Sequence, residues 1–270
     1  MVKTAKTSSP LPPAVILCGG RGTRLREKTD HVPKPMVEVG SRPLLWHIMK
    51  IYAHFGVRDF IICAGYRSDY ILDYFMRYRY AQSDVKIDLA SGAIDTLGRP
   101  AAEELNWRVI VANTGEETLT GLRVSRIQKY INHDRFFLTY GDGVGDVDIA
   151  ATLSTHIQSG KKATICGVRP SSRFGELSIE SGIVTSFKQK PQVTEGWVNG
   201  GFMVIDTDAL SQIPPGADVA LEEGFLAPLS QRHEVGIYQH SGFWQCMDTY
   251  REMELLEGLW RSNKAPWKVW

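Results

Sequence analysis

The chain has 270 residues, 43% of them hydrophobic and 23% charged, and its formal net charge at pH 7 is +1. This length and apolar content are enough to bury the core of one α/β domain. The balanced charge argues against a broad nucleic-acid-binding surface, so any anion-binding site should be local.

Cysteine spacing and hydropathy indicate the expected compartment. The four cysteines are far apart and form no C-x-x-C pair, which argues against a zinc site and favours reduced, buried thiols. Residues 1–13 are polar and proline-rich and lack the apolar core of a signal peptide, and no apolar run approaches membrane-spanning length. We therefore expect a flexible tail at residues 1–13, a single domain at residues 14–270, and a cytoplasmic protein that binds no membrane.

The first part of the chain alternates strand and helix patterns. An apolar run predicts a buried strand at residues 14–18, and helical spacing of apolar side chains predicts a helix at residues 41–55 with Ser41 as its N-cap. Residues 60–64 and 70–80 repeat the strand–helix order. This alternation predicts an α/β fold with a doubly wound, mostly parallel, Rossmann-like sheet, whose sites lie beyond the carboxyl ends of the strands.

The pattern of the later part is different, because short strand-like pieces follow one another. We expect these pieces to form a small C-terminal subregion that acts as a lid or faces the substrate. The predicted elements are strands at 85–88, 107–111 and 135–140, helices at 122–131 and 149–158, short strands at 163–168, 176–179, 184–187 and 202–205, and a final helix at 249–260.

A glycine-rich loop at residues 19–24 directly follows the first strand. Three glycines allow backbone N–H groups to approach an anion, and Arg21 and Arg24 add donors suited to phosphate oxygens. The loop lacks the lysine of the P-loop pattern and the third glycine of the dinucleotide fingerprint. It predicts a phosphate site of another kind, with an ordinary structural turn as the alternative.

Three further side chains are candidates for charge chemistry. Lys34 lies between two prolines that stiffen the backbone, so it is suited to neutralise a transferring phosphoryl group, although it could be an ordinary surface lysine. Asp142 ends a buried strand and can bind Mg²⁺, or belong only to a Gly-Asp-Gly turn. Asp248 precedes a predicted helix and is either a second metal ligand or an N-cap.

The glycine loop and the lysine motif together resemble the sugar-1-phosphate nucleotidyltransferases. The motif G-G-x-G-T-R-L begins at residue 19 and P-K-P begins at residue 33. The resemblance covers nearly the whole chain and is strongest to the glucose-1-phosphate cytidylyltransferase branch. It is carried by residues 43–75, 114–123, 138–149, 197–202 and 242–249.

The resemblance implies that a cytidylyl group passes from CTP to a sugar 1-phosphate, with Mg²⁺ bound and pyrophosphate released. It also implies a homo-oligomer, to which the aromatic residues Trp260, Trp267 and Trp270 could offer an apolar surface. The implied residues are Lys34, Arg24 and Asp142 for catalysis; Gly19, Gly20, Arg21, Gly22, Thr23, Arg24 and Arg123 for the nucleotide; Tyr140, Gly175, Gln189, Lys190 and Asn199 for the sugar phosphate; and Asp142 and Asp248 for the metal.

Several alternatives stay open at this point. Gln189 stands where the family usually has a glutamate that contacts sugar hydroxyls, so the sugar can differ from glucose. The choice of cytosine as the base rests on the resemblance alone. The polar segment at residues 91–106 is assigned no role in the site, although it could contact a neighbouring subunit. Other readings are a non-catalytic nucleotide-sugar-binding protein and a dinucleotide-binding oxidoreductase.

Overall fold

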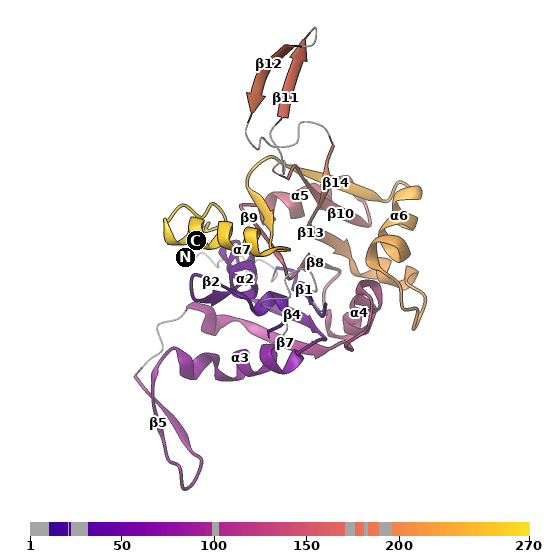
Figure 1. Ribbon diagram of the computed structural model, residues 1–270. Helices are drawn as coiled ribbons and strands as arrows, with labels where there is room; N and C mark the ends of the chain where they lie inside the picture. Colours follow the sequence, from indigo (N-terminus) through magenta and orange to yellow (C-terminus); the bar gives the residue numbers. More distant parts are fainter. Residues whose placement is uncertain are drawn as a thin grey trace, which may run out of the picture.

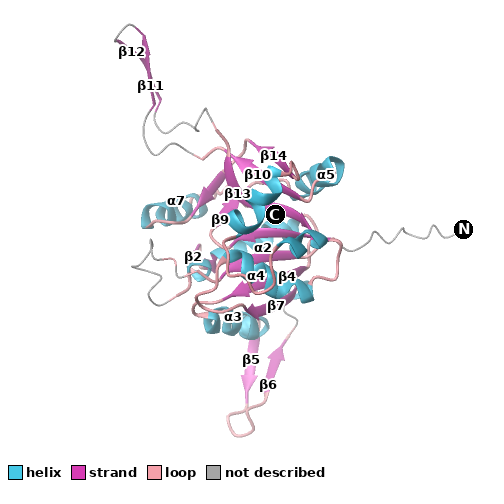
Figure 2. Cartoon of the chain, turned by 90° about the vertical axis from the view of Figure 1, so that its right-hand side faces the viewer, coloured by secondary structure: helices cyan, strands magenta, loops and turns pink. Residues whose placement is uncertain are grey.

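The computed structural model describes residues 11–20, 22, 32–98, 103–170, 176–180, 183–188 and 196–270. A seven-stranded sheet runs through the molecule in the order β14-β10-β13-β8-β1-β4-β7, with helices packed on its two faces (Figures 1 and 2). Only β13 runs antiparallel to its neighbours, so the predicted mostly parallel α/β sheet is confirmed. The strands are β1 (Ala14–Cys18), β4 (Asp59–Ala64), β7 (Arg108–Asn113), β8 (Arg135–Tyr140), β10 (Ala163–Val168), β13 (Val198–Asp206) and β14 (Val235–His240).

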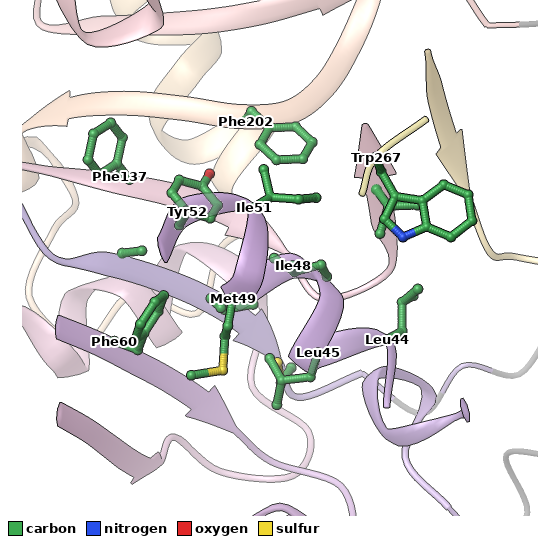
Figure 3. Close-up of a cluster of buried hydrophobic side chains, with 14 of the residues drawn as sticks. Leu44, Leu45, Ile48, Met49, Ile51, Tyr52, Phe60, Phe137, Phe202 and Trp267 are labelled. Atoms are coloured by element: carbon green, nitrogen blue, oxygen red, sulfur yellow. The ribbon is translucent and has the colours of Figure 1, made fainter. Parts of the chain in front are cut away.

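The central strands are apolar throughout because both faces of the sheet are covered. Alternate side chains of β1 enter two separate cores: Ile16 belongs to one, and Val15 and Leu17 to the other. Helix α2 (Leu44–His54) covers the first face, where its apolar side chains meet Phe60, Phe137 and Phe202 (Figure 3). Helix α4 (Thr120–Ile127) covers the second face.

The start of α2 differs from the predicted helix at residues 41–55. Ser41 has a φ of 61° and lies in the turn between the short strands β2 (Glu38–Val39) and β3 (Arg42–Pro43), so its prediction as an N-cap was wrong. The helix begins at Leu44, after Pro43, and no side chain caps it. The residues predicted to form the first turn of the helix instead belong to the antiparallel pair of β2 and β3.

The other helices agree closely with their predicted ranges. They are α3 (Ser68–Ala81), α5 (Ile149–Ser159) and α7 (Tyr250–Arg261), whereas α4 gives way at residue 128 to the 3-10 turn η4 (Gln128–Tyr130). Short elements that sequence patterns did not reveal are η2 (Lys34–Met36), η3 (Glu103–Asn106), η5 (Thr207–Gln212), the π-helix η6 (Glu222–Leu226), α6 (Ala227–Gln231), β9 (Gly143–Gly145) and β15 (Trp244–Cys246). Among the described residues, no helix has the length and apolar character needed to cross a membrane.

The later strands do not form a separate lid, contrary to expectation. Strands β10, β13 and β14 extend the central sheet, because β13 pairs directly with β8. Only β11 (Glu176–Glu180) and β12 (Ile183–Lys188) form a separate hairpin. A second hairpin, formed by β5 (Asp84–Ile87) and β6 (Ile94–Leu97), projects from the opposite end of the molecule (Figures 1 and 2).

The C-terminal tryptophans pack within the chain rather than offering a large free surface. The fully buried ring of His47 lies at the centre of this packing, with the Trp260 ring centroid 4.6 Å away. Nε2 of His47 lies 2.8 Å from the carbonyl oxygen of Val39, and the indole N–H of Trp267 points to Nδ1 at 3.3 Å. A carbonyl only accepts and an indole N–H only donates, so the imidazole is neutral with its proton on Nε2.

This packing predicts a loss of stability in mild acid. Burial lowers the pKa of His47 from 6.5 to about 4. Between these two pH values the imidazole is protonated in the unfolded chain and neutral in the folded chain. The His47 contribution is therefore complete above pH 6.5 and is lost as the pH falls from 6.5 to 4, at a cost of about 3 kcal/mol. Urea unfolding of the wild type and His47→Phe over this range should show a smaller pH dependence in the variant.

The exposed His54 on the same helix supplies the control, because His54→Gln should keep the wild-type dependence. An NMR titration that finds the His47 ring protonated near pH 6.5 in the folded protein would contradict the prediction.

Candidate active site

A pocket of about 510 Å³ opens beyond the carboxyl ends of β1 and β8. This is the edge at which parallel sheets place their binding sites. Eight of the residues predicted from the sequence line it, although they come from five separate stretches of the chain. They are Gly19, Gly20, Gly22, Lys34, Arg123, Tyr140, Asp142 and Asp248.

Arg123 supports the glycine loop from beneath. Its Nη2 donates to the carbonyl of Gly19 at 3.1 Å, and a Cβ atom added to Gly19 would stand 2.0 Å from Nη1. Only glycine at position 19 leaves room for this guanidinium. The other acceptors of Arg123 are Thr114 Oγ1 at 2.8 Å and the carbonyls of Ala64, Gly115 and Glu116.

Arg123 was predicted to lie near the nucleotide phosphates, and its observed contacts are with the protein itself. The residue is buried and lies beside the expected loop, but both terminal nitrogens already donate to protein oxygens. These hydrogen bonds tie β1, β4 and the start of α4 together. The observed contacts of Arg123 thus hold the loop in its conformation.

Lys34 links the two predicted metal ligands. Its ammonium nitrogen lies 2.8 Å from Oδ2 of Asp142 and 2.5 Å from Oδ1 of Asp248. Burial lowers the pKa of Lys34, but its contacts with Asp142 and Asp248 outweigh burial and leave the pKa raised. The lysine is thus charged and only 8% exposed, which rules out the alternative of an ordinary surface lysine.

Backbone pairing brings the two aspartates together across 106 residues of sequence. Strand β9 follows Asp142, β15 precedes Asp248, and the two strands are paired with Cys246 opposite Gly143. The N–H of Met247 also donates to the carbonyl of Asp142 at 2.8 Å. Gly141 is required here, because a Cβ atom on it would lie 2.9 Å from Cys18 Sγ, the Leu17 carbonyl and Pro35.

The alternative role of Asp248 as a helix N-cap is excluded by the cap of α7. Thr249 is the N-cap, and its hydroxyl accepts from the N–H of Glu252 at 3.3 Å. The Glu252 carboxylate in turn accepts from the N–H groups of Asp248 and Thr249, which completes a capping box. The side chain of Asp248 is left to face Lys34.

The place that the Lys34 ammonium occupies between Asp142 and Asp248 also suits a metal cation. Two carboxylates from different segments face one positive charge, and the Asp142 side chain keeps 36% exposure toward the pocket. In the part of the chain that the structure describes, no group of three or more His, Cys, Asp or Glu side chains could hold a metal ion. A divalent ion here would take two protein carboxylates and fill its remaining positions with water and substrate oxygens, as Mg²⁺ commonly does.

A second pair of polar side chains belongs to the same pocket. Tyr140 donates from its hydroxyl to Glu222 Oε1, and both residues line the pocket. Asn199, predicted for the sugar phosphate, lies on β13, where its Oδ1 accepts from the N–H of Gly201 at 2.9 Å. Burial and then the contact with Glu222 raise the pKa of Tyr140, so the phenol stays protonated.

The sequence reasoning missed three polar residues that line the pocket: Glu222, Thr118 and Thr120. Glu222 is one of two successive glutamates in a segment without a recognisable motif, so no local pattern singles it out. Thr118 and Thr120 lie in the stretch that resembles the family, and that resemblance was their only available signal. The predicted residues Arg21, Thr23, Arg24, Gly175, Gln189 and Lys190 lie outside the described residues.

Comparison with known proteins places the chain in a family. The nucleotidyl transferase family profile matches residues 13–244, and the chain belongs to this family of enzymes. The glucose-1-phosphate cytidylyltransferase of Salmonella typhi is 45% identical over 258 residues, which cover 95% of this chain and 99% of the relative. A probable glucose-1-phosphate cytidylyltransferase of Bacillus subtilis is 37% identical, with 95% and 99% covered.

A solved structure supports the fold independently. HddC from Yersinia pseudotuberculosis aligns with a TM-score of 0.66 over 93% of this chain and 100% of its own, at 22% identity. At that identity the likeness bears on the fold alone. It agrees with the α/β sheet described above.

Proposed function

We propose that the protein is a glucose-1-phosphate cytidylyltransferase. It transfers the cytidylyl group of CTP to α-D-glucose 1-phosphate and releases CDP-glucose and pyrophosphate. The observation that carries this proposal is the single ammonium of Lys34 held between Asp142 and Asp248 beside a glycine loop, within a nucleotidyl transferase chain. The near-complete coverage of the two cytidylyltransferase relatives supports the choice of CTP and glucose 1-phosphate.

The described residues suggest how the reaction is promoted. The glycine loop offers backbone N–H groups to the triphosphate, and Lys34 offers a positive charge where the transferring phosphoryl group gains negative charge. A sugar phosphate is already ionised near neutral pH, so its oxygen can attack the α-phosphorus without a protein nucleophile. Positioning and charge stabilisation then account for catalysis.

Enzymes of this family generally use a divalent metal ion, and we propose Mg²⁺ for this chain. Asp142 and Asp248 would hold the ion, which would polarise phosphate oxygens and neutralise their charge. We also retain the sequence-based assignments of Arg24 to the departing pyrophosphate and of Lys190 to the sugar phosphate.

The alternative within the same chemistry is another sugar 1-phosphate or another nucleotide, because Gln189 departs from the usual glutamate. A panel of the four common nucleoside triphosphates crossed with several sugar 1-phosphates, read by pyrophosphate release, tests the assignment. CTP with glucose 1-phosphate should give the highest kcat/KM. Faster turnover of another pair would replace the substrates while leaving the reaction class intact, whereas no release from any pair would favour a non-catalytic nucleotide-sugar-binding protein.

Loss of either aspartate should abolish turnover by removing the charges that hold the cation. Asp142→Asn and Asp248→Asn are each expected to lower kcat at least about 100-fold, a magnitude typical of lost electrostatic stabilisation. Binding of Mn²⁺ as a Mg²⁺ substitute, followed by electron paramagnetic resonance, should weaken in parallel. Asp208→Asn is the control, since Asp208 is exposed and pairs with Lys162; normal Mn²⁺ binding by both site variants would refute the metal assignment.

We further propose that the protein is a homo-oligomer that uses the β5–β6 hairpin. Ile87 pairs with Ile94 and Val85 with Thr96, so the three apolar residues lie on one face of the hairpin, and all are exposed. Leu89 at its turn is 91% exposed. A lone two-stranded hairpin is marginally stable in water, and a second copy of the chain would cover this face.

Charges placed on that face should therefore reduce the molecular mass in solution. Ile87→Lys combined with Ile94→Lys is expected to give a smaller species by size-exclusion chromatography with light scattering. Lys86→Gln, on the opposite face, should leave the wild-type mass unchanged. A monomeric wild type, or a double variant of unchanged mass, would contradict the proposal.

The cytoplasmic location stays a prediction from the sequence. It agrees with the state of the four cysteines, all of which are free.

A further inference from the structure

We infer that Glu222 is a specificity-determining residue that accepts a hydrogen bond from a hydroxyl of the sugar substrate. The inference rests on the proposed function and adds a residue to its acceptor site. It starts from the pocket, where Glu222 is the one carboxylate besides Asp142 and Asp248 among the described lining residues.

The backbone of Glu222 is held in place from both directions. The N–H of Leu221 donates to Thr120 Oγ1 at 2.8 Å, and the side chains of Leu221 and Phe225 are buried in the core beneath. Glu222 itself begins the π-helix η6, an irregular element that often occurs at functional sites. This support fixes an exposed carboxylate at the rim of the pocket instead of leaving it on a mobile surface.

The position of Tyr140 decides which side of the pocket Glu222 serves. Tyr140 packs against Gly201 of β13, where a Cβ atom would lie 2.7 Å from its Cδ2. In the sheet, β13 and β1 are on opposite sides of β8, and β1 carries the glycine loop. The ring of Tyr140, which holds Oε1 of Glu222, therefore lies on the β13 side of β8, opposite the strand that carries the glycine loop, and we assign the acceptor sugar to that side.

The chemistry of the carboxylate restricts its ligand to a group that donates a hydrogen bond. Glu222 uses Oε1 to accept from Tyr140, and within the described part of the chain no protein group donates to Oε2. A carboxylate repels phosphate oxygens but accepts readily from hydroxyl groups. Glucose 1-phosphate offers four hydroxyl groups, and each of them can donate to the second carboxylate oxygen of Glu222.

Steady-state kinetics of Glu222→Ala tests this role. Loss of a hydrogen bond to a charged acceptor predicts a KM for glucose 1-phosphate that rises about 10- to 100-fold, with the KM for CTP unchanged. Glu223→Ala is the matched control, because Glu223 is the next residue of the same helix and does not line the pocket. It should behave as the wild type.

A panel of 2-, 3-, 4- and 6-deoxyglucose 1-phosphates separates recognition from a general structural effect. The wild type should discriminate against at least one deoxy sugar, and Glu222→Ala should have lost that discrimination while keeping the others. Equal discrimination by both proteins would overturn the inference. A rise in the KM for CTP alone would also overturn it, since the carboxylate would then contact the nucleotide.

Calorimetric titration with glucose 1-phosphate distinguishes this inference from the proposed function. A wild type that releases no pyrophosphate contradicts the proposed function, whatever Glu222 does. In that case weaker binding of glucose 1-phosphate by Glu222→Ala than by the wild type still supports the inference. Equal binding, or no binding by either protein, overturns it.

Discussion

The rest of the site depends on one ionic contact, in which Lys34 lies between Asp142 and Asp248. Two carboxylates that contact the same atom repel each other unless that atom carries a positive charge. Burial of Lys34 makes its attraction to both carboxylates stronger than it would be in water. The geometry explains why the surrounding backbone is so constrained. Prolines flank Lys34, a glycine precedes Asp142, and a capping box follows Asp248.

The glycine loop depends on a similar arrangement of buried charge and backbone. Arg123 donates to carbonyl groups from three separate segments, including that of Gly19, and its guanidinium occupies the space that a side chain at position 19 would need. A buried cation on the inner side of Gly19 thus supports the start of the loop. A charged residue near a predicted phosphate site can therefore also stabilise the protein itself.

Sequence patterns predicted the fold well where local and tertiary preferences agree. The continuous apolar runs of β1, β4 and β8 predict strands buried on both faces, and the predicted ranges of α2, α3 and α7 agree with the structure to within a few residues. The patterns failed at Ser41, where a strand pair replaced a helix cap, and after residue 160, where short strands joined the main sheet. At Ser41 a short local strand pair competes with the helix for the same residues, whereas the later strands pair with partners that lie far away in the sequence.

The sequence by itself determined the kind of chemistry, which is the binding of phosphate groups and a cation. This prediction depends on residue type alone: glycines give backbone freedom, and Lys34, Asp142 and Asp248 supply charge. Only the tertiary structure decided which of them meet. It directed Arg123 to backbone carbonyls, left Asp248 free of its helix cap, and added Glu222 to the pocket. The physical reason is that contacts between residues 108 or 214 positions apart arise from sheet order and strand pairing, which no short motif contains.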